Sequence, residues 1–204
     1  KTETAVDLAK KMAIEGLRVL LIDFDAQATA TLISSGIIPD LELDYDDTIT
    51  NALIKDPELI KDCIRKTHFM GLDIIPANLA IQDCDLMLPD EKQNNYKVLG
   101  SPVQRLEKSL NLVKDKYDVI LMDCGPNLGI LTLNAIYACN AILMPIPPSM
   151  SDYSSFVMYT QSLTCLFREF PNKKLEYLRI VLTKHNGGNE ALKMENLMRS
   201  QFGS

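Results

Sequence analysis

Four apolar residues followed by two acids, Val19-Leu20-Leu21-Ile22-Asp23-Phe24-Asp25, form the most informative segment of the chain. The apolar run shows no alternation with polar residues, which is typical of a strand covered on both faces in a parallel sheet. In open α/β sheets, ligands bind beyond the carboxyl ends of the strands. The segment therefore predicts a buried strand that ends in a binding site at Asp23 and Asp25.

A helix is predicted over residues 3–15, directly before this strand. Its apolar residues recur at helical spacing and form one stripe of Ala5, Leu8, Ala9, Met12 and Ala13. Lys1 and Thr2 precede the helix, and a Lys-Thr pair that opens a helix is the form in which a phosphate-binding loop ends. We therefore predict that Lys1 contacts the β- and γ-phosphates of a nucleotide and that Thr2 binds Mg²⁺.

Strands and helices alternate along the rest of the chain. Further strands are predicted over residues 72–76, 118–123, 141–144 and 178–182. The strand at 141–144 is predicted to be buried and to be broken by Pro145, Pro147 and Pro148. Helices are predicted over residues 28–33, 48–53, 102–115, 130–139, 151–170 and 190–201, with Ser151 or Asp152 as the cap of the long one. Residues 39–47 and 77–95 have the composition of loops, the second with a short helix.

Alternation of this kind predicts an α/β fold, in which right-handed crossovers build a doubly wound, mostly parallel sheet with helices on both faces. We expect a single nucleotide-binding domain over residues 1–204, truncated at both ends. The glycines of the phosphate-binding loop would precede Lys1, and a further segment would follow the last helix.

Composition and charge restrict the class of protein. The chain has 204 residues, 47% hydrophobic and 24% charged, as in ordinary globular proteins. The net charge is −6, yet residues 161–204 contain seven Lys or Arg and four Asp or Glu, so a nucleic-acid contact would have to be local to that end. Five scattered cysteines without a Cys-x-x-Cys pair favour a reducing cytoplasm over disulfides or structural zinc. No apolar run is long enough for a membrane span, and no signal peptide is visible.

Three acids stand at predicted strand ends. Asp123 follows an apolar strand and precedes Gly125, which is the form of a Walker B acid that orients Mg²⁺; an acid that caps the next turn is the alternative. Asp23 and Asp25 point to the same face of their strand. Two carboxylates near phosphates are useful when a metal or an attacking water lies between them. For Asp23 a buried, hydrogen-bonded acid at the strand end is the alternative.

The segment Thr183-Lys184-His185-Asn186 follows the strand predicted at 178–182. Guanine-specific phosphate-loop proteins have Asn-Lys-x-Asp at this place, and their Asp accepts two hydrogens from guanine. An Asn side chain cannot offer two acceptors in that way, which favours adenine. Thr183 and Asn186 are therefore predicted to bind the nucleotide, with an ordinary loop start as the alternative. His68 and His185 are predicted to be solvated loop residues rather than catalysts.

These motifs, in this order, resemble the ParA family of deviant-Walker ATPases, and look closest to its larger plasmid-partition members. The resemblance rests on segments spread over most of the chain: Lys1 to Ala5, Val19 to Thr31, Gly71 to Leu79, Tyr117 to Gly129, Leu133 to Ala135, Pro145 to Pro147, and Leu182 to Lys184. Ala26 and Ala28 depart from it, since the family has Pro and Gly at these places.

The resemblance implies an enzyme that uses ATP and Mg²⁺. Lys1 would bind the phosphates and Thr2 the Mg²⁺, Asp25 in the first switch would orient the attacking water, and Asp123 would be the Walker B acid, with Gly125 to Gly129 as the second switch. It also implies a ParA/MinD-like fold, slow ATP hydrolysis, and a homodimer that closes across two ATP molecules. Its ATP-bound form would bind DNA non-specifically, and a ParB-type centromere-binding protein would stimulate hydrolysis.

Such a cycle would serve plasmid or chromosome partition in the bacterial cytoplasm, on the nucleoid in the ATP-bound state and without a membrane partner. Three alternatives stay open. The first is a MinD-like regulator of cell division, which would end in an amphipathic membrane helix. The second is a redox iron protein that uses Cys124, with Cys84 as the nearest candidate partner. The third is a regulator that binds nucleotide without turnover.

Overall fold

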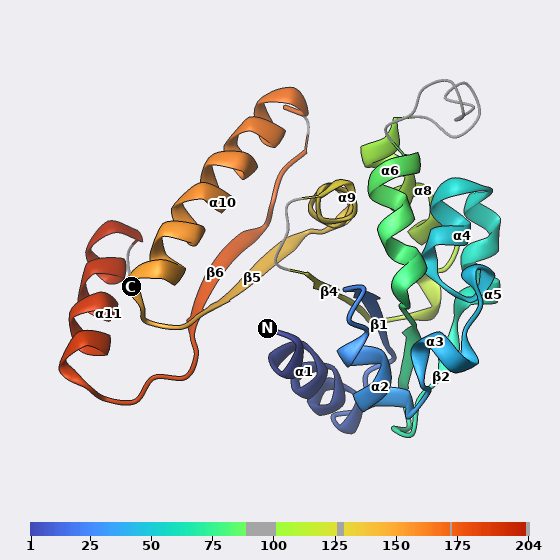
Figure 1. The fold of residues 1–204 in the computed structure, drawn as a ribbon, viewed down its shortest axis with the longest axis horizontal. Coiled ribbons are helices and arrows are strands. Elements are labelled where there is room, and N and C mark those ends of the chain that lie inside the picture. The colour runs from blue at the N-terminus through green and yellow to red at the C-terminus, as the bar shows by residue number, and fades with distance from the viewer. Residues whose placement is uncertain (89–100, 126–128, 172, 203–204) are drawn as a thin grey trace. The chain divides into compact units, whose positions relative to one another are not determined.

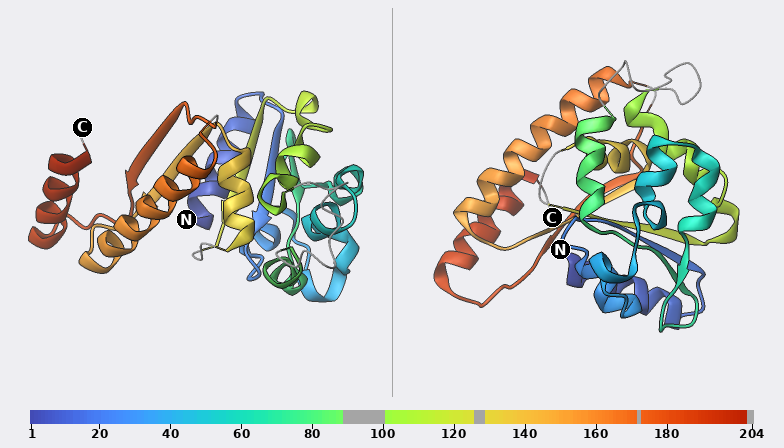
Figure 2. Two further views of the ribbon diagram at one scale, coloured as in Figure 1. Left: turned by 90° about the horizontal axis from the view of Figure 1, so that it is seen from above. Right: turned by 45° about the vertical axis from the view of Figure 1, so that its right-hand side comes forward.

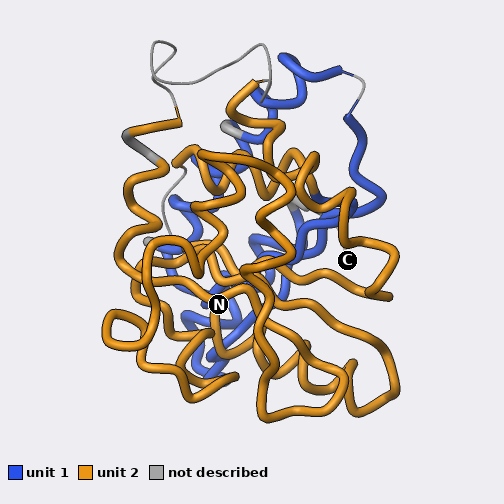
Figure 3. The backbone as a smooth tube through the Cα atoms, turned by 90° about the vertical axis from the view of Figure 1, so that its right-hand side faces the viewer, with its two compact units in different colours: residues 1, 139–204 blue, residues 2–138 orange. Residues whose placement is uncertain are grey.

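The computed structural model describes residues 1–88, 101–125, 129–171 and 173–202 (Figure 1). Its contacts divide the chain into two compact units (Figure 3). The larger unit consists of residues 2–138, and the smaller consists of residue 1 and residues 139–204. Each unit contains its own parallel pairing of strands, so the predicted α/β class with a mostly parallel sheet is confirmed.

The larger unit is built on a four-stranded sheet in the order β2-β3-β1-β4. Its strands are β1 (Val19–Phe24), β2 (Arg65–Lys66), β3 (Leu72–Ile75) and β4 (Val119–Cys124). The central strand β1 runs parallel to both neighbours, whereas the two-residue edge strand β2 is antiparallel to β3. The predicted strands at 19–25, 72–76 and 118–123 are thereby confirmed, and β2 was not predicted because two residues give no periodic signal.

Helices cover both faces of this sheet (Figures 1 and 2). They are α1 (Thr2–Ile14), α2 (Thr29–Ser35), α3 (Pro39–Glu42), α4 (Ile49–Ile54), α5 (Ile60–Cys63), α6 (Asp83–Met87), α8 (Arg105–Leu110) and α9 (Ile130–Ala138). Short 3₁₀ turns lie between them, at Tyr45–Asp47, Pro57–Leu59, Leu79–Gln82, Pro102–Gln104 and Lys114–Lys116. The single helix predicted over 102–115 is therefore two 3₁₀ turns around the short α8.

The core explains why β1 shows no alternation in sequence. Its side chains point alternately into two buried clusters, and all six of its residues are buried. Leu20 and Ile22 enter the cluster formed with α4, α5, α8 and α9, while Val19 and Leu21 pack against α1 on the other face. A strand covered on both faces needs apolar residues at every position, as the sequence predicts.

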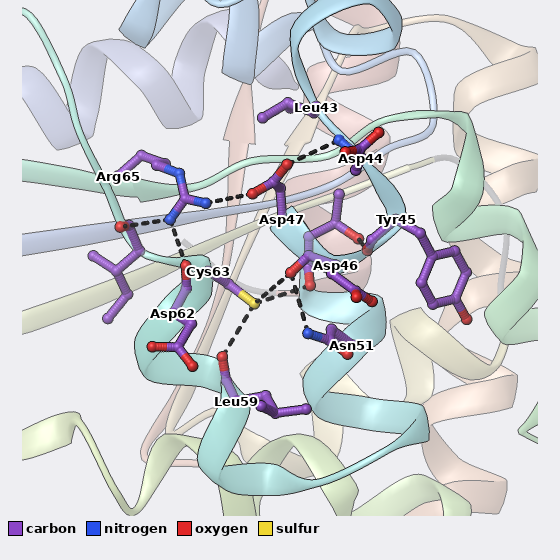
Figure 4. A network of polar contacts seen from close by, with 12 residues as sticks. Leu43, Asp44, Tyr45, Asp46, Asp47, Asn51, Leu59, Asp62, Cys63 and Arg65 are labelled. Atoms are coloured by element: carbon purple, nitrogen blue, oxygen red, sulfur yellow. Dashed lines mark hydrogen bonds and ion pairs between the residues drawn. The ribbon is translucent and has the colours of Figure 1, made fainter.

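The acidic segment 39–47 is more ordered than the predicted loop. It forms α3 and the turn Tyr45–Asp47, and a polar network ties it to α5 and β2 (Figure 4). Arg65 forms an ion pair with Asp47, and the Cys63 thiol lies 3.1 Å from the Thr48 carbonyl oxygen, to which it donates. These contacts join residues that are far apart in the chain, so no local periodicity predicts the structure of this segment. The predicted loop at 77–95 is the turn Leu79–Gln82 and α6, and its residues 89–95 lie outside the described residues.

The smaller unit has two parallel strands, β5 (Ala141–Ile146) and β6 (Tyr177–Leu182), and two helices, α10 (Met150–Glu169) and α11 (Asn189–Phe202). The prediction of a buried strand at 141–144 that ends before Pro145 is wrong in two respects. Pro145 lies inside β5 in register with Val181, and only two of the six residues of β5 are buried. A proline is tolerated in a strand whose N–H at that place is not needed by a neighbour.

The helices of the smaller unit agree with the sequence apart from one cap. Ser149, rather than Ser151 or Asp152, caps α10, because its hydroxyl accepts a hydrogen bond from the Asp152 amide at 3.2 Å. Along the part of the chain that the structure describes, none of the helices is both long and apolar enough to cross a membrane.

Candidate functional site

Two acids predicted from separate motifs lie side by side at the carboxyl edge of the sheet in the larger unit. The parallel register of β1 and β4 pairs Asp23 with Asp123 and Phe24 with Cys124. Five residues earlier on both strands, Arg18 and Asp118 fix this register at the opposite edge. The Arg18 amide and guanidinium donate to Asp118 at 2.7 to 3.1 Å, and the Asp118 amide donates back to the Arg18 carbonyl at 2.8 Å.

Asp23 is a fully buried carboxylate with a full set of donors. One oxygen, Oδ2, accepts the amide and the hydroxyl of Thr31 at 2.9 and 2.8 Å, and Oδ1 accepts the amide of Asp25 at 3.1 Å. Burial raises the pKa of Asp23 to about 6, the nearby charge of Asp123 adds to the rise, and the hydrogen bonds oppose it. These features correspond to the alternative of a buried, hydrogen-bonded acid at the strand end.

Asp25 is half-buried and directly follows β1. Its Oδ1 accepts the Gln27 amide at 3.0 Å, which closes a turn after β1. A Cβ atom placed on Gly125 would lie 3.6 Å from the Asp25 Cγ, so the Asp25 carboxylate faces the backbone just after β4. A side chain at position 125 would therefore contact the Asp25 carboxylate, and residues 126–128 of the predicted second switch lie outside the described residues.

Ala28 has a backbone conformation that glycine adopts more easily than alanine. Its φ is +50°, in the left-handed region that is costly for residues with a side chain. The Ala28 amide donates to the Asp25 carbonyl at 2.8 Å, and Ala28 stands at the N-cap of α2. The turn after Asp25 therefore contains a left-handed residue although no glycine is present there.

Thr2 reaches the same edge of the sheet through α1. Gly71 marks the opposite, amino edge, because its carbonyl accepts the Val19 amide at 2.8 Å, and a Cβ on Gly71 would lie 3.6 Å from the Ala13 Cβ. The last turn of α1 thus lies at the amino edge. Since 13 helical residues and six strand residues both span about 20 Å, the start of α1 lies near the carboxyl edge. Thr2 is half-buried there, and the exposed Lys1 precedes it.

The amino end of α1 adds a positive electrostatic potential at this edge of the sheet. The first backbone N–H groups of a helix have no partners within it, and the helix dipole favours anions at that end. The two strand ends offer carboxylates, and α1 offers N–H groups and the Thr2 hydroxyl. This combination suits a phosphate that is bound together with a hard, oxygen-liganded cation.

Thr183 and Asn186 lie in the smaller unit, just after β6. The Thr183 amide donates to the Ile146 carbonyl at 3.0 Å and so extends the pairing of β5 with β6. The Asn186 side chain accepts the Gly188 amide at 2.9 Å. It lines a cavity of about 380 Å³ formed by the ends of β5 and β6, whose other walls are Pro147, Pro148, Ser149, Lys184, Gly188, Asn189, Glu190 and Ala191. No pattern in the sequence identified Pro147 and Pro148 as walls of a cavity.

The two histidines differ. His68 is exposed, as predicted for a loop histidine. His185 is exposed at the residue level, but its ring has two partners: Nδ1 accepts the Gly187 amide at 3.1 Å, and Nε2 lies 3.2 Å from the Glu195 carboxylate. His185 is thus an anchor of the loop after β6 rather than a freely solvated side chain.

The cysteine positions bear on the redox alternative. Cys124 is half-buried at the end of β4, whereas Cys84 has no exposed surface and belongs to the core cluster of the larger unit. A fully buried thiol cannot reach a second subunit, so Cys84 is not the partner that a bridging cluster would need.

Comparison with known proteins identifies the family. A family model described as "AAA domain" matches residues 1–175. The protein SopA of Escherichia coli K12 is 34% identical over 208 residues, which cover 100% of this chain and 53% of SopA. The chain is a ParA-family AAA domain. The chain spans about half the length of SopA.

Solved structures show the same fold. A plasmid partition protein from Borrelia burgdorferi superposes with a TM-score of 0.75 at 19% identity, covering 97% of this chain and 79% of that one. Cobyrinic acid a,c-diamide synthase from Mycobacterium smegmatis, with a bound ATP analog and magnesium, superposes with a TM-score of 0.81 at 20% identity, covering 98% of this chain and 77% of that one. The predicted ParA/MinD-like, phosphate-loop architecture is therefore confirmed.

Proposed function

We propose that the protein is a slow, Mg²⁺-dependent ATPase that acts as an ATP-dependent dimerisation switch in plasmid or chromosome partition. The observation that supports this most is the meeting of Asp25 and Gly125 at the paired ends of β1 and β4, beside the start of α1. Membership of the ParA family supports the same activity.

The residues at this edge fit a magnesium ion, because hydroxyl and carboxylate oxygens are the ligands that it prefers. Thr2 and Asp123 would hold the ion, Asp123 through water. Magnesium, when bound, neutralises the charge of the phosphate oxygens. The prediction that Asp23 is also a ligand stays a prediction, and its three hydrogen bonds from the chain favour a positioning role instead.

Hydrolysis would proceed by in-line attack of water on the γ-phosphorus. Asp25 accepts a hydrogen bond from this water and orients it, since its carboxylate lies at the edge of the sheet and one of its oxygens is fixed by the Gln27 amide. A bond forms between the water oxygen and phosphorus, and the bond from phosphorus to the bridging oxygen of ADP breaks. One proton of the water stays on the new phosphate and the other is released to solvent. Lys1 binds the β- and γ-phosphates, and the products are ADP and inorganic phosphate.

For the base we propose the cavity after β5 and β6. Its prolines offer apolar surface to a flat ring, and the Asn186 amide can both donate and accept a hydrogen bond. Thr183 would contribute through its backbone. This assignment predicts that ATP binds better than GTP.

The partners follow from the family and are proposed on that ground. In the ATP-bound state the protein would form a homodimer and bind DNA non-specifically, on the nucleoid and in the cytoplasm. A ParB-type centromere-binding protein would stimulate hydrolysis. A MinD-like role predicts binding to anionic lipid vesicles instead of DNA, and a regulator without turnover predicts ATP binding without phosphate release.

The test compares ATP hydrolysis with ATP binding in the intact protein that carries Asp25→Ala. We expect phosphate release in the presence of DNA to fall by about 100-fold, because the attacking water loses its orienting group, while the Kd for ATP changes by less than about threefold. Asp115→Ala is the matched control, since Asp115 is an exposed acid before β4, at the opposite edge of the sheet. Unchanged phosphate release in Asp25→Ala, or none in the wild type with DNA, would contradict the proposed ATPase.

A further inference from the structure

We propose that Thr31 is a positioning residue, which holds Asp25 in place through Asp23. This inference rests on the proposed function, because Asp25 is there the group that orients water. Thr31 itself touches no substrate: it is fully buried in the first turn of α2.

The Thr31 hydroxyl makes two hydrogen bonds at once. It donates to Asp23 Oδ2 at 2.8 Å and accepts the amide of Ala77 at 3.0 Å. Ala77 follows β3 and is fully buried as well. A hydroxyl can donate one hydrogen bond and accept another at the same time. The Thr31 hydroxyl therefore links the Ala77 N–H group to the Asp23 carboxylate, with the hydroxyl oxygen lying between them.

Asp23 links Thr31 to Asp25. Its second oxygen, Oδ1, accepts the Asp25 amide at 3.1 Å. The Asp25 side chain in turn faces Gly125, after β4. The chain of bonds from Ala77 through Thr31 and Asp23 to Asp25 therefore joins the ends of the neighbouring strands β3 and β1, and Asp25 lies beside the end of β4.

The hydroxyl is needed because the Asp23 carboxylate has no exposed surface. A buried charged group is costly unless hydrogen-bond donors satisfy its oxygens. Donors to Asp23 satisfy its oxygens and fix which way its carboxylate points. Valine has the shape of threonine without the hydroxyl, so Thr31→Val would leave the buried Ala77 amide without this acceptor and Asp23 with one donor fewer. The amide of Asp25 would then lose its fixed acceptor.

The test compares Thr31→Val with two other variants of the intact protein. Thr31→Ser keeps the hydroxyl. Thr50→Val is the matched control, because Thr50 is also fully buried, in α4, and its hydroxyl has no hydrogen-bond partner among the described residues. Two measurements are made. Steady-state kinetics give kcat and KM for ATP hydrolysis, and hydrogen exchange is followed in the peptide that contains residues 24–28.

We expect Thr31→Val to lower kcat by at least about tenfold with KM within about twofold, since a misplaced group costs rate rather than binding. Hydrogen exchange in residues 24–28 should rise by at least about tenfold, because an amide that loses its buried acceptor opens more easily. Thr31→Ser should restore most of both values, and Thr50→Val should change neither.

The exchange measurement needs no turnover, so it separates this inference from the proposed function. If exchange in residues 24–28 of Thr31→Val equals that of the wild type, the positioning role is wrong whether or not the protein hydrolyses ATP. If kcat and KM change together and Thr50→Val has the same effect, Thr31 serves only the stability of the core. If the wild type shows no hydrolysis but exchange rises as expected, the ATPase proposal fails and the link from Thr31 to Asp25 stands.

Discussion

The two compact units hold their candidate site residues in different ways. In the larger unit Asp23 and Asp25 end a strand whose six residues are all buried between helices on both faces. In the smaller unit Asn186 stands on a loop after β6, a strand without buried residues. The His185 and Asn186 side chains accept hydrogen bonds from the Gly187 and Gly188 amides of this loop. Groups on buried strands are positioned more rigidly than groups on loops. Asp25 thus directly follows a buried strand, whereas the proposed base cavity is lined in part by residues of an exposed loop.

The largest effect should come from shortening matched leucines in the two sheets. Leu21 in β1 has no exposed surface, whereas Leu143 in β5 is 41% exposed. Leu21→Ala should lower the free energy of unfolding by about 3 kcal/mol and Leu143→Ala by less than about 1 kcal/mol, because only the first leaves a cavity in a closed core. Denaturant titration followed by circular dichroism measures both. Equal losses would show that β5 is as enclosed as β1.

A second contrast is the pH dependence of two acids. The pKa of Asp23 is raised to about 6, mainly by burial, so the protonated form stabilises the folded state. That stability is present below pH about 4 and is lost as the pH rises towards about 6, at no more than about 1.4 kcal/mol per pH unit. Comparing unfolding free energies of the wild type and Asp23→Asn at several pH values isolates this slope.

Glu195 in the smaller unit should behave with the opposite sign. Hydrogen bonding from Arg199 lowers the pKa of Glu195, with a further contribution from His185. Its contribution to stability is therefore present above the ordinary glutamate range and is lost as the pH falls through the lowered pKa. Glu195→Gln should remove the loss of folding stability that occurs as the pH falls. Asp23→Asn should remove the loss of folding stability that occurs as the pH rises. Slopes of the same sign in both variants would contradict this assignment.

The smallest effect concerns two residues with positive φ. Ala28 in the larger unit is buried with φ +50°, and Lys184 in the smaller unit is exposed with φ +54°. Glycine relieves the left-handed strain at both places, at about 1 kcal/mol. Ala28→Gly also loses a buried methyl group, so its net change should stay within about 0.5 kcal/mol, while Lys184→Gly should gain up to about 1 kcal/mol. Thermal melts of the unliganded protein measure both, and a clear gain in Ala28→Gly alone would reverse the comparison.

Much of the larger unit could be predicted from sequence, because its strands and first helix have long, uninterrupted patterns. β1, β4, α1 and α9 appear within one or two residues of their predicted bounds. The same patterns placed Asp23, Asp25 and Asp123 at strand ends, and the register shows why Asp23 and Asp123 meet.

What could not be predicted depends on partners distant in the chain. The bond from Ala77 to Thr31 joins residues 46 positions apart, and the pair of Arg65 with Asp47 joins residues 18 positions apart. No local pattern reports such contacts. Nor could the sequence decide whether Asp23 is a ligand or a buried acid, since the same residue at the same strand end suits both until its donors are known. The apolar run of β5 resembles that of β1 and predicts a buried strand, but only two of its six residues are buried.

The central claim is that the joined ends of β1 and β4 bind ATP together with magnesium. Isothermal titration of ATP into the intact protein, with and without Mg²⁺, tests it through Asp123→Asn, with Asp115→Asn as the control at the opposite edge. The account predicts that Mg²⁺ lowers the Kd for ATP by at least about tenfold in the wild type and the control, but by less than about threefold in Asp123→Asn. A full magnesium effect in Asp123→Asn would contradict it.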